Sequence, residues 1–157
     1  MSAVQETHQD DTEYVTVMIG DQLFGLPINR VQDVFVPDRM TRVPLAPPEV
    51  SGVLNLRGRI VTAIDMRVRL GLPPAEHEGD RTNMAVGIDF GGEAYGILID
   101  QLGEVMKLDP ATREPNPANL DPRWAGVSDG VHQLDGQLLV VLDVDRVLAQ
   151  GREAVAA

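Results

Sequence analysis

The chain has 157 residues, contains no cysteine and carries a formal net charge of −11. Its length suits one compact unit or two small lobes that share a core. The absence of cysteine excludes disulfides, thiolate nucleophiles and sulfur-ligated zinc or iron, and the negative charge disfavours binding to nucleic acid or anionic membranes. Because no apolar run could span a membrane and the N-terminus lacks a secretory signal, we expect a cytoplasmic protein.

Short β-strands follow one another along most of the chain. After a polar stretch at 1–12 that we expect to be a disordered tail, "YVTVMIG" alternates in polarity and leads through a turn into "DQLFGLPI". The later runs "RIVTAID" and "QLLVVLD" are β-branched and aliphatic, and each follows a glycine. Helical periodicity is confined to short segments after Asp65 and Asp143. This pattern predicts an all-β fold with a few short helices.

The sequence also contains an internal repeat, which predicts two lobes of one design. "FGLPINRVQDV" from Phe24 aligns with "YGILIDQLGEV" 71 residues later, and "GVLNLRGRIVTAIDM" from Gly52 aligns with "GVHQLDGQLLVVLDV" 78 residues later. We therefore expect one domain of two small antiparallel barrels, each with five strands. The predicted boundaries are 13–157 for the domain, about 13–70 and 83–150 for the lobes, and 71–82 for a turn-rich linker.

The repeat separates positions that the fold requires from positions that are free to bind a partner. Where both halves carry the same residue type, a structural role is the simpler interpretation. Arg57 fails this test, because its counterpart in the second half is Asp135, of opposite charge. We therefore predict that Arg57 recognises a partner, and we assign a structural role to the surrounding signature residues Gly52, Asn55, Leu56, Gly58 and Asp65.

Few residues could support catalysis or bind a metal. The three histidines, His8, His77 and His132, are not spaced as metal ligands on one element would be. The acidic stretch around His77 is interpreted as a solvated loop, and the chain has neither a "GxxxxGK" phosphate loop nor a "GxSxG" nucleophile elbow. We therefore expect a binding protein with no catalytic residue, no cofactor and no metal, and we interpret Trp124 as a packing anchor.

Two segments carry a family resemblance. "YVTVMIGDQLFGLPINRVQDV" and "GVLNLRGRIVTAIDMRVRLGL" resemble the opening hairpin and the most recognisable segment of the CheW family of chemotaxis coupling proteins. Pieces of the second half extend the resemblance from about Glu13 to about Leu148. The chain departs from the family pattern at Thr62 and Ala63, where proline and valine are common. Asp33 stands where glutamate is common, which keeps the charge.

The resemblance implies a non-enzymatic adaptor of two five-stranded Src-homology-3-like barrels. Such an adaptor links the cytoplasmic tips of chemoreceptors to the regulatory domain of the histidine kinase CheA and is recruited to receptor arrays at the membrane without inserting into it. In that family the receptor helix lies in a groove between the lobes, and the matching positions here are Val31, Asp33, Arg57 and Val105. The kinase is expected at the end of one lobe, on apolar surface.

Other interpretations fit parts of the sequence. A coupling protein of a non-flagellar, pilus-type pathway would carry the same motifs. A larger regulator, with an attached receiver or kinase, is disfavoured because we expect no room for either beyond Ala157. A small β-barrel module that binds a ligand would need a deep pocket with convergent polar groups.

Overall fold

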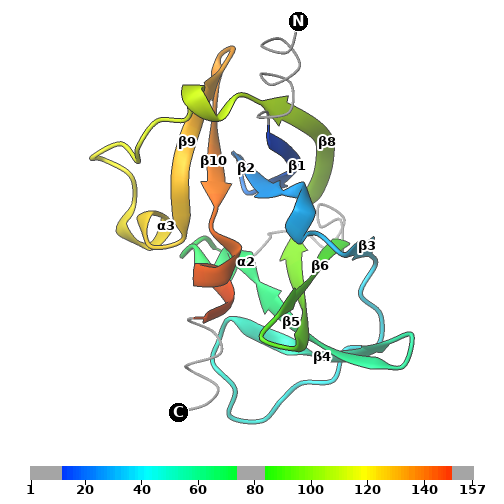
Figure 1. The fold of residues 1–157 in the computed structure, drawn as a ribbon. Helices are drawn as coiled ribbons and strands as arrows, with labels where there is room; N and C mark the ends of the chain where they lie inside the picture. Colours follow the sequence, from blue (N-terminus) through cyan, green and yellow to red (C-terminus); the bar gives the residue numbers. More distant parts are fainter. Residues whose placement is uncertain (1–11, 74–83, 150–157) are drawn as a thin grey trace, which may run out of the picture.

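The computed structural model describes residues 12–73 and 84–149, which form two five-stranded sheets packed one above the other (Figure 1). We name the first sheet and its loops the terminal lobe, since it holds the first and last strands. Its strands, in spatial order, are β8 (Gln101–Leu108), β1 (Thr12–Ile19), β2 (Gln22–Pro27), β10 (Gln137–Leu142) and β9 (Ser128–Leu134). The central lobe has the order β3 (Asp33–Phe35), β6 (Met84–Phe90), β7 (Glu93–Ile99), β5 (Arg59–Asp65) and β4 (Val50–Leu56).

The two halves of the sequence do not form one lobe each, which corrects the predicted division into 13–70 and 83–150. Strands β1 and β2 lie in the terminal lobe, whereas β3 to β5 from the same half lie in the central lobe. The second half is divided in the opposite way, with β6 and β7 in the central lobe and β8 to β10 in the terminal lobe. The two repeats therefore exchange their first hairpins. Equivalent strands of the two repeats occupy equivalent places in the two sheets, which confirms the internal repeat.

The sheets are mixed, although the sequence predicted antiparallel barrels. The exchange creates one parallel pair in each sheet, β10 with β2 and β5 with β7, while the remaining pairs are antiparallel. The predicted all-β class with two five-stranded units is confirmed. The predicted tail at 1–12 lies outside the described residues except for Thr12, which begins β1. Residues 74–82 of the predicted linker at 71–82 also lie outside the described residues.

Each sheet curls until the loop after its edge strand meets its far edge. Thr41, after β3, pairs with Val53 of β4, and Glu114, after β8, pairs with Val131 of β9. Each loop crosses a strand at a glycine, and a Cβ atom at Gly52 would lie 2.6 Å from the Thr41 carbonyl oxygen. The loop can therefore approach only where the strand has no side chain.

One apolar core runs through both lobes. It joins buried side chains of the terminal sheet, such as Val17 and Phe24, to buried side chains of the central sheet, such as Ile64 and Ile97. A smaller cluster around Phe35 lies within the central lobe. Because the lobes share a core, they are expected to unfold together rather than as independent domains.

Short helices follow the last strand of each repeat, as the sequence predicted. Asp65 caps α2 (Met66–Arg69) by accepting a 2.9 Å hydrogen bond from the Arg67 amide, and a second helix covers residues 144–149. The remaining short helical segments are η1 (Ile28–Arg30), η3 (Pro110–Thr112) and α3 (Pro122–Ala125). Trp124 of α3 packs against Phe24 and donates a 2.9 Å hydrogen bond to the Leu70 carbonyl. Among the described residues, no helix has the length and apolar character needed to cross a membrane.

Candidate partner-binding surfaces

Arg57 lies at the tip of the hairpin between β4 and β5. Leu56 pairs with Arg59, so the turn has only two residues, and both have positive φ, +53° at Arg57 and +84° at Gly58. Asn55 closes the turn by accepting a 3.0 Å hydrogen bond from the Gly58 amide. The left-handed conformation is costly for any residue with a Cβ, so arginine is not the residue that this turn favours.

The Arg57 side chain reaches across to the edge of the sheet. Its Nη1 lies 2.6 Å from Oδ2 of Asp33, the first residue of β3. The other carboxylate oxygen, Oδ1, accepts a 2.8 Å hydrogen bond from the Val34 amide, which holds Asp33 in place. The Arg57 side chain is 74% exposed. Because an arginine has five N–H donors and this pair uses one of them, the guanidinium can still bind acceptors on a partner.

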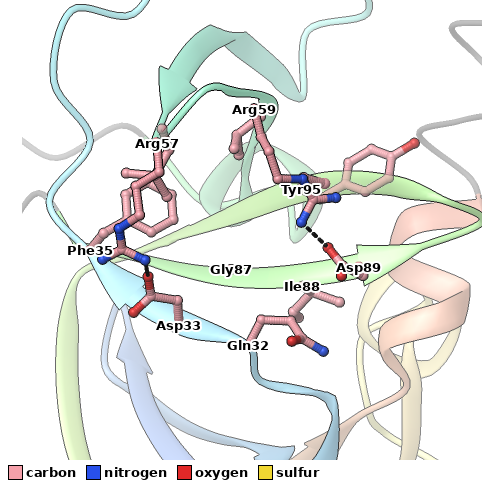
Figure 2. Close-up of a pocket in the computed structure, with 12 residues that line it drawn as sticks. Gln32, Asp33, Phe35, Arg57, Arg59, Gly87, Ile88, Asp89 and Tyr95 are labelled. Atoms are coloured by element: carbon pink, nitrogen blue, oxygen red, sulfur yellow. Dashed lines mark hydrogen bonds and ion pairs between the residues drawn. The ribbon is translucent and has the colours of Figure 1, made fainter.

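The pair borders a depression of about 360 Å³ on the central lobe, shown in Figure 2. A second ion pair, Arg59 with Asp89 at 3.3 Å, stands on the opposite rim. Buried apolar side chains form part of the lining, including Phe35 and Ile88. An apolar floor between two ion pairs can hold an apolar side chain whose polar neighbours hydrogen-bond to the arginines.

The structure brings together two of the four residues predicted to form the receptor groove. Asp33 and Arg57 form the pair described above, and Val31 is half-buried against the shared core just before β3. Val105 is 51% exposed and lies in the other lobe, on the edge strand β8. Neither valine lines the depression. A partner that touches Arg57 and Val105 must therefore contact both lobes.

Sequence reasoning missed a group of exposed apolar side chains on the central lobe. Ile60 is 68% exposed and Leu45 is fully exposed with φ +64°, a conformation that costs energy for a leucine. We name this group the central apolar residues: Val36, Met40, Val43, Leu45 and Ile60. The signal for Ile60 was present in the sequence, since strand alternation places it on the same face as Thr62.

The equivalent position of the terminal lobe is covered. The repeat aligns Ile60 with Leu138, which is half-buried and packs against the shared core. The same place in one fold is therefore exposed in one lobe and packed in the other. The exposure of Ile60 is therefore not a requirement of its place in the fold.

His132, the third histidine of the sequence, is buried in the terminal lobe. Its Nδ1 lies 3.2 Å from the Thr112 hydroxyl, and that hydroxyl donates its proton to the Asp109 carbonyl. The Nδ1 atom must therefore carry the proton, which leaves Nε2 as an acceptor that has no partner among the described residues. Burial, with help from Arg113, lowers the pKa of His132. The described part of the chain has no group of three or more potential metal ligands.

Comparisons with known proteins give one consistent result. The sequence model of the CheW-like domain family matches residues 13–152. The chain is 27% identical over 143 residues to the chemotaxis protein CheW of Klebsiella aerogenes, covering 91% of this chain and 85% of that protein. It is 28% identical over 144 residues to the chemotaxis protein CheW of Helicobacter pylori, covering 92% and 86%. The crystal structure of the scaffolding protein TtCheW from Thermoanaerobacter tengcongensis superposes with a TM-score of 0.77 at 23% identity, covering 87% of both chains.

Proposed function

Because the chain belongs to the family of the CheW-like domain, we propose that it couples the cytoplasmic tips of chemoreceptors to the histidine kinase CheA. The family consists of chemotaxis scaffold proteins and not of enzymes. In this proposal the protein works in the cytoplasm and is recruited to receptor arrays at the membrane. It uses one surface for the receptor and a second surface for the kinase.

The Arg57–Asp33 pair carries the receptor part of the proposal. Arg57 is largely exposed, is held by a carboxylate in a defined direction and occupies a turn that favours glycine or asparagine over arginine. The conformational cost, together with the fixed direction of the side chain beside the depression, supports a role of Arg57 in recognition. The receptor helix would contact Arg57 and Asp33 in the central lobe and Val105 in the terminal lobe. Val31 lies on the segment between β2 and β3, which crosses from the terminal lobe to the central lobe.

The central apolar residues support the kinase part of the proposal. Their exposure has no counterpart at the equivalent strand position of the terminal lobe, where Leu138 is packed. The kinase regulatory domain would bury Ile60 and Leu45 at the end of the central lobe. Burying two such side chains contributes several kcal/mol of favourable free energy at about 25 cal/mol per Å² of apolar surface.

Binding of the two partners to separate surfaces is the direct test. A receptor cytoplasmic fragment and the kinase regulatory domain are titrated separately into the wild type, Arg57→Glu and Ile60→Asp, with circular dichroism to confirm folding. We expect Arg57→Glu to lose binding of the receptor fragment but not of the kinase domain, and Ile60→Asp to lose binding of the kinase domain but not of the receptor fragment. The coupling function would be refuted if the wild type bound neither partner. Loss of both partners in each variant would refute the two separate surfaces.

A further inference from the structure

The chain passes between the lobes at two crossings that the internal repeat makes equivalent. The first crossing is η1, between β2 of the terminal lobe and β3 of the central lobe. The second is Asp100, the single residue between β7 of the central lobe and β8 of the terminal lobe. Each crossing is tied by an ion pair to the short helix that follows the last strand of the other repeat.

The ion pair at the second crossing joins Arg67 of α2 to Asp100. Arg67 Nη2 lies 2.6 Å from Oδ2 and Arg67 Nε lies 3.0 Å from Oδ1, so both carboxylate oxygens are engaged. Oδ2 also accepts a 2.8 Å hydrogen bond from the Gly20 amide, in the turn between β1 and β2. The side chains are only 19% and 18% exposed. Asp100 thus joins the helix of the central lobe to a turn of the terminal lobe, and its hydrogen bonds raise the pKa of Arg67.

The ion pair at the first crossing has the opposite polarity. Arg30 of η1 lies 2.7 Å from Asp145 of the helix at 144–149. The repeat aligns Arg67 with Asp145, and it aligns Asp100 with Asn29, the neighbour of Arg30. In one crossing the helix supplies the arginine and the crossing supplies the aspartate, whereas in the other these roles are reversed.

The reversed polarity distinguishes the exchanged arrangement of the repeats from the alternative one. If each helix met the crossing of its own repeat, Arg67 would face Arg30 and Asp145 would face Asp100. Both encounters would be repulsive. Opposite charges meet only when the helix of one repeat lies against the crossing of the other repeat. The charges therefore favour the exchanged arrangement over the one in which each helix meets its own crossing, and Arg67 facing Arg30 would also oppose pairing of the first repeats of two chains.

We propose that the residues of the Arg67–Asp100 and Arg30–Asp145 ion pairs are positioning residues that fix the angle between the two lobes. They would thereby keep the two parts of the receptor surface, one on each lobe, in a fixed relative position. The receptor part of this inference rests on the proposed function, because that surface includes Val105 in one lobe and Arg57 in the other. The kinase surface lies within the central lobe. Loosening the contact between the lobes should therefore weaken binding of the receptor more than binding of the kinase.

The distance between the lobes tests the inference without any partner. Since the chain has no cysteine, spin labels can be placed on Asp38→Cys in the central lobe and Asp135→Cys in the terminal lobe, both exposed positions. We expect Arg67→Asp and the milder Asp100→Asn to broaden or shift the distance distribution measured by pulsed electron paramagnetic resonance. The double variant Arg67→Asp with Asp100→Arg restores opposite charges but lacks the acceptor for the Gly20 amide, so we expect it to recover the distribution in part. Arg113→Asp is the matched control, since Arg113 pairs with Asp129 at 3.0 Å inside one lobe.

Binding then tests the consequence. We expect the two single variants to bind the receptor fragment at least about fivefold more weakly, with unchanged affinity for the kinase regulatory domain. The double variant should recover part of the lost affinity. An unchanged distance distribution in both Arg67→Asp and Asp100→Asn would overturn the inference, as would the same change in Arg113→Asp. If the wild type fails to bind the receptor fragment, the proposed function fails, whereas the distance measurement still decides whether the ion pairs position the lobes.

Discussion

Arg57 and Asp33, 24 residues apart in the chain, meet at 2.6 Å on the rim of the central-lobe depression. The internal repeat aligns them with Asp135 and Glu104, which are both acidic and cannot form such a pair. One fold thus carries an ion pair in one lobe and two like charges in the other. The pair is therefore not a requirement of the fold, which supports its role in binding.

The first prediction separates binding from stability at Arg57. Arg57→Gly removes the side chain from a left-handed position, so we expect unfolding in urea to show equal or greater stability, by up to about 1 kcal/mol. Binding of the receptor fragment, measured by calorimetry, should weaken by about 2 kcal/mol, or roughly thirtyfold.

Arg39→Gly is the matched control for this prediction. Arg39 is also exposed and left-handed, with φ +56°, and it does not line the depression. Its replacement should give a similar gain in stability with unchanged receptor binding. A stability loss of more than about 1 kcal/mol in Arg57→Gly would identify the ion pair as structural and would remove the argument for recognition.

The second prediction concerns the central apolar residues. Ile60 is 68% exposed, so Ile60→Ser should change the free energy of unfolding by less than about 0.5 kcal/mol. Binding of the kinase regulatory domain should weaken about tenfold because the apolar contact is lost. Leu138→Ser, at the equivalent packed position, should instead destabilise the fold by about 1–2 kcal/mol. Unchanged kinase binding by Ile60→Ser would place the kinase elsewhere.

The third prediction tests the close approach at Gly52. A Cβ atom there would lie 2.6 Å from the Thr41 carbonyl oxygen, so Gly52→Ala should force the loop away and cost about 1–3 kcal/mol in urea unfolding. Gly58→Ala is the control, since φ is +84° but no atom lies within 4 Å of the added Cβ. Its cost should be about 1 kcal/mol. Equal costs for the two variants would contradict a steric role for Gly52.

The fourth prediction is a pH dependence of stability caused by His132. Its pKa is lowered in the folded protein by burial, so the folded state disfavours the proton that the unfolded chain accepts near its ordinary pKa of 6.5. Stability should therefore fall as the pH drops below about 6.5, by at most about 1.4 kcal/mol per pH unit. His132→Leu, which copies the equivalent Leu54, should lose this dependence. Parallel stability curves for the wild type and the variant would show that His132 does not titrate.

The sequence by itself determined the strands, their turns and the repeat. Alternation and glycine positions are local, so "RIVTAID" and "QLLVVLD" could be recognised as β5 and β10, and the short helices after Asp65 and Asp143 followed from the cap residues. The contrast between Arg57 and Asp135 likewise needed only the alignment of the two halves.

Only the tertiary structure decided which hairpin belongs to which sheet. Pairing β2 with β10 and β7 with β5 brings together strands far apart in the chain, and local propensity contains no information on that choice. The same long-range pairing left Ile60 exposed while it packed Leu138, although both are aliphatic residues at one position of the repeat. Exposure depends on what the rest of the chain brings to a strand, because burial is a property of the assembled core and not of the residue.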